Sequence, residues 1–391
     1  MKEVAIVSYC RTGIARAQRG ALNQTHGIPL AAHVLRSAVE RAGVDGREIE
    51  DVVLGCGLPE GATGHNIARN AAIEAFGIDV PGITVNRYCG SGLSAASIVA
   101  NRIACGEAQV AIAGGVESIS LVQFSLHLDG FFYAPLQQRM PAVWWTMNQT
   151  ADFVAKKYGI TREQQDEYVV KSQGRVKDAT ARGVYAEEIV PFATKMKVTD
   201  KATKATSERD VTLDKDEGPR PDTTLEGLAK LPAVYPGGTT TAGNASQLSD
   251  GAAALVMMDA DLAAKRGLPI LGLFRGMQLA AVHPEEMSIA YTPAIRKLMA
   301  HHNVSKDSVD LWELHEAYAV TTLYNQAQLE TPWETTNVNG GAIALGHPYG
   351  MSGIRYAGSA LMELRRRNKK RAVIGVCTAG GMATAALLER P

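Results

Sequence analysis

Strands and helices alternate in the pattern of apolar positions over residues 1–120. Continuous apolar runs predict buried strands, and apolar residues spaced three and four apart predict helices. The predicted strands lie at 4–7, 51–55 and 108–115, with a further β-rich run that begins at Ile83. The predicted helices lie at 30–42 and 66–75, and a third follows Gly90-Ser91-Gly92 and continues to about Ala104. Such alternation is typical of an α/β layer.

The same order of elements recurs near the C-terminus. A predicted helix at 292–302 and a strand at 311–314 match 30–55 element by element, 336–341 parallels 84–90, and 371–377 parallels 109–115. The interval from Asp51 to Val110 is 59 residues, and that from Asp310 to Ala372 is 62 residues. We interpret this as a duplicated α/β half, which predicts a site where the two halves meet.

The stretch between the two copies breaks the alternation. It contains an aromatic- and methionine-rich segment at 124–147, an amphipathic segment at 149–158, a helix capped by Thr161 that runs to about Arg182, and a strongly charged segment at 194–218. Long insertions in compact folds carry binding or assembly duties, although the charged part fits a solvated surface excursion equally well. A buried strand at 252–258 is expected to rejoin the first half.

These patterns predict three parts. The first half comprises 1–120 and 242–267, the inserted loop domain comprises 121–241, and the second half comprises 268–391.

Composition excludes several classes of partner. Lys plus Arg and Asp plus Glu both number 40, so neither nucleic acid nor an anionic membrane is expected as the main partner. The 391 residues are 46% hydrophobic, as in a soluble globular protein. A strand begins at Val4, and no apolar run is long enough to span a bilayer, so we expect a cytoplasmic protein without a signal peptide.

The five cysteines are odd in number and far apart, and none forms a Cys-x-x-Cys pair. We therefore expect a reducing compartment, no disulfide framework and no zinc site.

Cys89 is the first candidate for chemistry. It lies at the end of a β-rich run and directly precedes Gly90-Ser91-Gly92, after which an alanine-rich helix begins. The free N–H groups of a helix N-terminus favour thiolate over thiol and can also bind an oxyanion. The alternative is a buried structural thiol.

Three further segments are expected at the C-terminal ends of strands: His315-Glu316-Ala317-Tyr318, the glycine-punctuated 339–350 around His347, and Cys377-Thr378-Ala379-Gly380-Gly381. Each alone has a structural interpretation, because a lone histidine is often a satisfied core residue and Glu316 could cap a helix. Together with Cys89 they lie where open α/β sheets bind ligands. A cysteine nucleophile, a histidine base and a second cysteine suit acyl transfer to carbon better than hydrolysis.

The chain resembles the thiolases from end to end. The resemblance rests on six motifs in order: 85–93, 114–118, 241–246 with 249–253, 315–318, 340–353 and 377–381. It implies two duplicated βαβαβαββ halves in a five-layered αβαβα arrangement, with a long loop domain inserted in the first half.

The resemblance also implies a two-step exchange. Cys89 would attack the keto carbon of a 3-ketoacyl-CoA while His347 takes its proton, and Cys377 would protonate the resulting enolate or, in reverse, abstract that proton. The backbone N–H groups of Cys89 and Ala379 would form one oxyanion site, and His347 with His315 the other.

Further implications concern ligands and assembly. Contacts to CoA or substrate would come from Ser246, Met147, Arg220, Ala317 and Tyr318. Coenzyme A and acyl-CoA would be substrates, with no permanently bound cofactor or metal. The chain would form a homo-oligomer, a dimer or a tetramer, and would act in fatty acid β-oxidation.

Several positions depart from the family pattern. His315 replaces the usual Asn, which resembles degradative branches and favours longer or bulkier substrates, and Tyr318 replaces the usual Phe. Ala379 replaces a Gly, which restricts the backbone of the oxyanion site. Thr146 replaces a His of the short-chain biosynthetic enzymes. The aromatic side chains expected to line an acyl pocket or to pack in the insertion are Phe131, Phe132, Trp144 and Trp145.

The resulting hypothesis is a 3-ketoacyl-CoA thiolase, with an acetyl-CoA acetyltransferase as the nearest alternative. A ketoacyl synthase would use Cys89, His315 and His347 but leave Cys377 idle. A protein of a different class, a silent thiolase-like acyl-CoA binder, is the remaining alternative.

Overall fold

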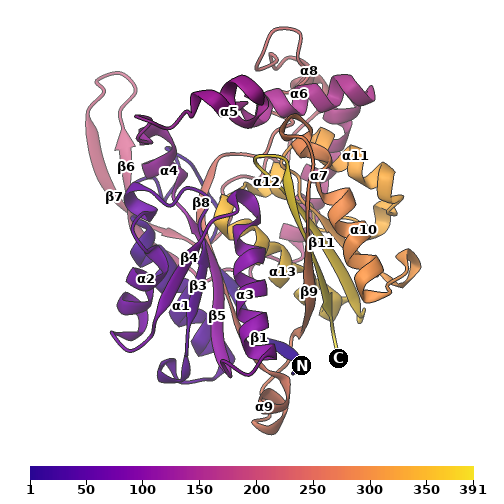
Figure 1. Ribbon diagram of the computed structural model, residues 1–391. Coiled ribbons are helices and arrows are strands. Elements are labelled where there is room, and N and C mark those ends of the chain that lie inside the picture. Colours follow the sequence, from indigo (N-terminus) through magenta and orange to yellow (C-terminus); the bar gives the residue numbers. More distant parts are fainter.

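Two layers of strands enclose a pair of central helices in the computed structural model, which describes residues 1–391 (Figure 1). The central helices are α3 (Ser91–Ala104) and α13 (Tyr349–Arg366), and they pack on each other and on both strand layers. The outer helices are α1 (Gly27–Ala42) and α2 (Ile67–Phe76) on one side, and α10 (Tyr291–His302) and α11 (Ala319–Leu329) on the other. The predicted five-layered α/β arrangement is confirmed.

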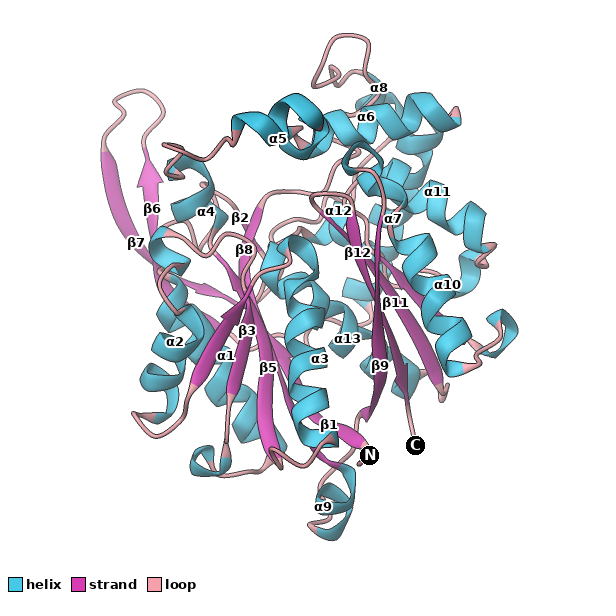
Figure 2. Cartoon of the chain, in the orientation of Figure 1, coloured by secondary structure: helices cyan, strands magenta, loops and turns pink.

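The strands belong to one ten-stranded sheet with two halves (Figure 2). The first half has the order β1 (Val4–Arg11), β8 (Ser249–Asp259), β5 (Val110–Glu117), β3 (Val52–Gly55), β4 (Gly82–Val85), with the short β2 (Ala15–Arg16) paired to β8. The second half has the order β9 (Gly272–Ala281), β12 (Met382–Glu389), β11 (Arg371–Thr378), β10 (Leu311–Leu314). Only two residue pairs, Ala5 with Leu273 and Ile6 with Gly272, join β1 to β9.

The duplication is visible in the element order. In each half an outer helix is followed by a 3₁₀ turn and a short strand, with the turns at Gly46–Glu48 and Lys306–Ser308. The strand β3 pairs in parallel with β5, and β10 pairs in parallel with β11. The short helices α9 (Ala260–Lys265) and α12 (Ala342–Leu345) complete the two halves.

One predicted parallel between the halves is only partial. The segment 336–341 was expected to match the strand β4, but Thr336 forms a single parallel bridge with Trp312. The next residue, Asn337, has a φ of 46°, which ends extended structure. Its side-chain amide accepts from the N–H of Leu314 and donates to the carbonyl of the same residue, both at 2.8 Å. An asparagine side chain thus takes the place of a neighbouring strand.

The residues between the halves form a mostly helical segment that covers one end of the sheet. Its elements are α4 (Ile119–Val122), α5 (Ala134–Arg139), α6 (Met147–Tyr158), α7 (Arg162–Ala181), β6 (Phe192–Thr199), β7 (Thr206–Leu213) and α8 (Leu225–Ala229). The expected cap of α7 is confirmed, because Thr161 and Gln164 form a reciprocal capping box. In Figure 1, α5 and α6 lie across the top of the molecule, above the ends of the strands.

The charged part of this segment is an antiparallel hairpin of β6 and β7, which the sequence pattern did not predict. Its base is buried, because Phe192 and Leu213 belong to the core of the first half, while most other hairpin residues are exposed. Further along, the side chain of Asn23 accepts from the N–H of Lys197 at 2.9 Å and donates to its carbonyl at 2.8 Å. The charged segment therefore fits a solvated surface excursion better than a binding or assembly element. None of the helices in the structure is both long and apolar enough to cross a bilayer.

Glycines determine how closely the central helices approach each other. A Cβ added at Gly92 would lie 2.7 Å from the carbonyl oxygen of Gly350, and one at Gly353 would lie 2.5 Å from the backbone nitrogen of Leu93. Both distances are shorter than a carbon atom tolerates, and the obstacles are backbone atoms that cannot rotate away. The N-terminal turns of α3 and α13 therefore meet backbone to backbone.

This contact predicts a sensitive position. Gly353→Ala should lower the free energy of unfolding by about 1–3 kcal/mol, because the added methyl group forces the two helices apart. Chemical denaturation measures the effect, and the matched control is Gly174→Ala in α7, where a Cβ would meet no atom within 4 Å. The control should be neutral or stabilising by up to about 1 kcal/mol. Equal stability of the two variants would show that the helices do not need the close approach.

Candidate active site

Cys89 occupies a tight turn at the entrance to α3. The turn is a 3₁₀ helix, Tyr88–Gly90, and Tyr88 has a left-handed φ of 46°, a strained conformation that is concentrated at functional sites. The hydroxyl of Ser91 fixes the turn by accepting from the N–H of Arg87 at 2.8 Å and donating to the carbonyl of Tyr88 at 2.6 Å. The expected position of Cys89 between a strand and a helix is confirmed.

His347 lies immediately before α13. Its N–H donates to the carbonyl of Gln247 at 3.0 Å, and its ring Nδ1 lies 2.7 Å from the hydroxyl of Ser352. That hydroxyl donates its own proton to the carbonyl of Pro348 at 2.9 Å, so it can only accept from His347. The proton of the neutral imidazole is therefore on Nδ1. The other nitrogen, Nε2, is buried without a partner and is free to accept a proton.

His315 follows β10 and joins the same group. Its ring is fully buried, both ring nitrogens are without partners, and its centroid lies 4.2 Å from that of His347. The sulfur of Cys89 and one ring nitrogen each of His315 and His347 all lie within 4.8 Å of one another. Residues separated by more than 200 positions in the sequence are thus brought together. Cys89 and His347 also line the neighbouring cavity, whereas His315 does not.

Cys377 and Ala379 reach the same place from the end of β11. Both line one cavity of about 440 Å³ together with Cys89 and His347. Ala379 is not among the residues with positive φ, whereas Gly380 and Gly381 have φ of 76° and 75°. The left-handed positions are therefore filled by glycine, and an alanine at 379 is not strained.

Burial keeps the cysteine and the histidine of this pair uncharged. Although Cys89 is partly exposed to the cavity, the surrounding protein and the carboxyl of Glu117 raise its pKa to about 12. Burial and the positive charge of Arg355 lower the pKa of His347 to about 3 and that of His315 well below its usual value. Burial also raises the pKa of Cys377, and so does the neighbouring Cys89.

The expectation of a thiolate-favouring environment at Cys89 is therefore wrong. The backbone N–H groups of Cys89 and Ala379 do lower the pKa of Cys89, but burial and Glu117 outweigh them. The Cys89 thiol and the His347 imidazole, which lie close together, are therefore both in their neutral forms.

The candidate CoA contacts are divided between two places. Ser246, Met147, Ala317 and Tyr318 all line the cavity, and Ser246 is held there because its N–H donates to the carbonyl of Ala317 at 2.9 Å. Arg220 lies outside this cavity. It borders a smaller pocket that shares Gln247 with the cavity.

Two of the four aromatic residues considered for the acyl pocket line the cavity, and two do not. Phe131 and Trp145 line the cavity, as does Thr146, whose hydroxyl caps α6 and lies 2.9 Å from that of Tyr235. Phe132 and Trp144 pack edge to face on Phe131 and are not part of the lining.

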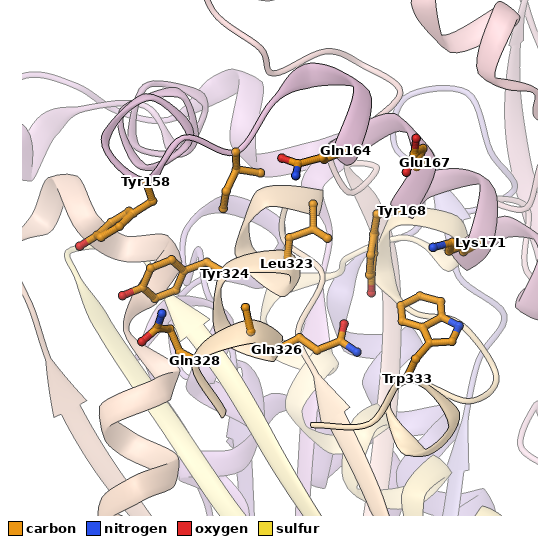
Figure 3. Close-up of a pocket in the computed structure, with 12 residues that line it drawn as sticks. Tyr158, Gln164, Glu167, Tyr168, Lys171, Leu323, Tyr324, Gln326, Gln328 and Trp333 are labelled. Atoms are coloured by element: carbon orange, nitrogen blue, oxygen red, sulfur yellow. The ribbon is translucent and has the colours of Figure 1, made fainter. Parts of the chain in front are cut away.

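A second cavity of about 430 Å³ lies between α7 and α11 (Figure 3). Its walls include Tyr158, Tyr168, Tyr324 and Trp333, and no cysteine or histidine. It contains none of the cysteines and histidines that the sequence indicates for the chemistry and is therefore not the candidate site.

Known proteins match the chain over its full length. The family model "Thiolase, N-terminal domain" matches residues 4–261, and "Thiolase, C-terminal domain" matches residues 268–390. The chain belongs to the thiolase family. The 3-ketoacyl-CoA thiolase of Bacillus subtilis is 39% identical to this thiolase, with 100% of both chains covered. The acetyl-CoA acetyltransferase of Cupriavidus necator is also 39% identical, again with 100% of both chains covered.

A solved structure agrees with this assignment. The crystal structure of the Bacillus anthracis acetyl-CoA acetyltransferase matches 100% of this thiolase and 99% of its own chain, with a TM-score of 0.89 and 35% identity. The thiolase is therefore an acyltransferase, and its family acts on CoA thioesters without a bound cofactor.

Two residues that support the site were missed in the sequence. Ser352 orients His347 from one turn into α13, and its position five residues after the histidine was the available signal. Glu117 was seen only as part of a motif. Its buried carboxyl accepts from the N–H groups of Gly57 at 2.7 Å and Gly350 at 2.8 Å, and burial raises its pKa to about 7.

Glu316 has a larger structural role than the helix cap considered from the sequence. Its carboxylate accepts from Tyr168 at 2.6 Å, from Ser172 at 3.0 Å and from the N–H of Ile343 at 3.1 Å. It thereby connects α7 of the insertion to the segment that carries His315.

The orientation of His347 predicts the effect of Ser352→Ala. Loss of the Nδ1 acceptor should lower kcat by about 10- to 100-fold with little change in KM or melting temperature, because the ring tautomer is no longer fixed. Steady-state thiolysis kinetics measure this change. The control is Ser359→Ala in the same helix, whose hydroxyl binds Glu188 instead. Full activity of Ser352→Ala would remove the hydroxyl from the site's function.

Proposed function

We propose that this thiolase is a 3-ketoacyl-CoA thiolase that cleaves its substrate with CoA to acetyl-CoA and a shortened acyl-CoA. The observation that carries the proposal is the convergence of Cys89, His347 and Cys377 on one cavity lined largely by apolar side chains. Relatives with this printed name and relatives named acetyl-CoA acetyltransferase are equally similar. Since sequence similarity does not separate the two activities, the largely apolar lining of the cavity is our reason for preferring the 3-ketoacyl-CoA thiolase.

In the first step Cys89 attacks the keto carbon and its proton passes to Nε2 of His347, which is unpartnered and neutral. The N–H groups of Cys89 and Ala379 face the sulfur, where they can stabilise the alkoxide that forms. Collapse breaks the bond between C2 and C3 and leaves an acyl group on Cys89 and an enolate of acetyl-CoA.

The enolate requires a second oxyanion site and a proton. We assign the site to His315 and to His347, which after the first step carries a proton on Nε2. A neutral imidazole N–H of His315, kept neutral by burial, is a suitable donor. Cys377 gives its proton to C2, and acetyl-CoA leaves.

The second step restores the protons. The thiol of CoA attacks the acyl group on Cys89, the proton of CoA passes to the Cys377 thiolate, and His347 returns its proton to Cys89. Each group is then in its starting state, and the reverse sequence is a Claisen condensation. The raised pKa values of Cys89 and Cys377 suit these proton transfers, because both thiols stay protonated until the substrate is bound and the transfer takes place.

The ligand path is the second part of the proposal. Ser246, Met147, Ala317 and Tyr318 are assigned to the pantetheine arm and thioester, and Arg220 to the nucleotide end of CoA. The shared residue Gln247 connects the two places.

The apolar part of the cavity is assigned to the acyl chain. It includes Leu58, Leu126, Phe131, Leu248 and Met287. Each methylene group that it buries contributes up to about 0.8 kcal/mol, or about fourfold in kcat/KM.

Assembly and location form the third part of the proposal. β4 is an edge strand. Ile83 within it is 48% exposed and Ile78, just before it in the sequence, is 77% exposed, which fits a homo-oligomer that covers this edge. We place the enzyme in the chain-shortening of fatty acyl-CoA in the cytoplasm.

A chain-length series tests the proposed substrate class. Thiolysis kcat/KM should rise by up to about fourfold per methylene from acetoacetyl-CoA until the cavity is filled. Phe131→Ala should reduce this gain, whereas Phe132→Ala, a neighbour outside the cavity, should retain it. A maximum at acetoacetyl-CoA, with longer substrates rejected, would favour the acetyl-CoA acetyltransferase instead.

The role of Cys377 is tested by isotope exchange. Cys377→Ala should still form an acyl-enzyme from acetyl-CoA but should exchange the α-protons of acetyl-CoA roughly 100-fold more slowly or worse, because the general acid and base is missing. NMR in deuterated water follows the exchange. Cys89→Ser should fail to form the acyl-enzyme at all, and Cys105→Ala, which changes an exposed cysteine, should behave as the wild type. Unchanged exchange in Cys377→Ala would remove Cys377 from the mechanism and would restore the ketoacyl synthase alternative.

A further inference from the structure

We infer that Cys89, His315 and His347 form a binding site for a thiophilic divalent cation such as Zn²⁺, and that the bound cation inhibits the enzyme. One sulfur and two imidazole nitrogens from these residues lie within 4.8 Å of one another. The inhibitory consequence rests on the proposed function, whereas the binding itself does not.

The donor set has the composition that zinc prefers. Zinc takes cysteine sulfur at about 2.3 Å and histidine nitrogen at about 2.0–2.1 Å, and sites with three protein ligands leave a fourth position for water. Mg²⁺ and Ca²⁺ prefer oxygen donors, and the cluster offers none, so these ions are not expected to bind there. The three donors must move inward by roughly an ångström to reach these distances, which side-chain rotation can supply.

The imidazole nitrogens that would bind the cation are buried and have no hydrogen-bond partners. His315 is 0% exposed and neither of its ring nitrogens has a hydrogen-bond partner, and His347 is 3% exposed with an unpartnered Nε2. A buried polar atom without a partner is costly, so a ligand that accepts these lone pairs is favoured. The ring of His347 is also oriented, because its Nδ1 donates to Ser352, as the second nitrogen of a metal-bound histidine does in known sites.

The two histidines offer ring nitrogens that no hydrogen bond occupies. Nε2 of His347 and both ring nitrogens of His315 are without partners, so the bond that must break when the cation binds is the S–H bond of Cys89. In the binding reaction, the Cys89 thiol and one cation give one metal thiolate and one released proton. The positive charge of Arg355 opposes the cation, and the carboxyl of Glu117 near Cys89 favours it.

Sequence spacing could not reveal this site. The expectation of no zinc site rested on the absence of closely spaced cysteine pairs, but the three donors come from positions 89, 315 and 347 and are assembled only by the contact between the two halves. The same three groups are the proposed nucleophile, base and oxyanion donor. A cation held by them would occupy the position of the substrate carbonyl.

Titration of the full chain with Co²⁺ alone, followed by Zn²⁺ displacement, tests the binding. We expect one ion per chain, a thiolate-to-cobalt charge-transfer band, and the visible bands of a four-coordinate ion. Cys89→Ser should lose the charge-transfer band, and His315→Asn should bind roughly 100-fold more weakly. Cys377→Ala should retain the band. His301→Asn is the matched control, because His301 and His302 form another close pair of rings outside the site.

Acylation of Cys89 provides a test that does not depend on the folding of variants. Preincubation of the wild type with excess acetyl-CoA should abolish the cobalt band, because an acylated sulfur is no longer a thiolate ligand. A band that survives acylation or Cys89→Ser, or binding that His301→Asn weakens as much as His315→Asn does, would place the ion elsewhere and overturn the inference. So would the absence of any thiolate band in the wild type.

Activity measurements separate the two proposals. Zn²⁺ should inhibit thiolysis in proportion to occupancy, and a chelator should restore the rate. Full thiolysis at full occupancy would contradict the proposed role of Cys89 and the inhibition but leave the cation site in place. Loss of thiolysis in Cys89→Ser without any cobalt band in the wild type would uphold the proposed function and refute the cation site.

Discussion

The close contact between the N-terminal turns of α3 and α13 is the constraint on which the site depends. Cys89 precedes one helix and His347 precedes the other, so the distance between their side chains is set by the distance between the two helices. Glycine is required on both sides of the contact, because a Cβ at Gly92 or at Gly353 would collide with backbone of the facing helix. Each half supplies one of the two helices, and neither half alone contains the site.

The same contact determines the electrostatics. Two helix starts, two strand layers and the insertion surround Cys89, His347 and Cys377, and burial is the largest cause of the pKa shift of each of these three groups. Thiols and imidazoles rest in their neutral forms. In the proposed mechanism, the backbone N–H groups of Cys89 and Ala379 stabilise the negative charge that develops, which favours the charge distribution of the transition state over that of the free enzyme.

The elements of the site could be predicted from local signals, but their supports could not. Hydrophobic periodicity placed Cys89 between a strand and a helix, and the repeated order of elements indicated that His347 and Cys377 would meet it. Ser352 and Glu117 act through contacts with residues distant in sequence or through ring orientation, which periodicity does not encode. The sequence also failed to indicate that Cys89 is a neutral thiol. The helix terminus that favours a thiolate is a local feature, whereas the burial that opposes it depends on the packed tertiary structure. Ala379 was a concern only until its backbone conformation was known, since the left-handed positions belong to the two glycines that follow it.

A crystal structure of the enzyme acetylated on its nucleophile tests the central claim most directly, namely that the joined helix starts hold nucleophile, base and oxyanion donors around one carbonyl group. The account predicts an acetyl group on Cys89, with its oxygen about 2.7–3.1 Å from the N–H groups of Cys89 and Ala379 and with Nε2 of His347 facing the sulfur. An acetyl group on another cysteine, or an acetyl oxygen directed away from both N–H groups, would contradict it.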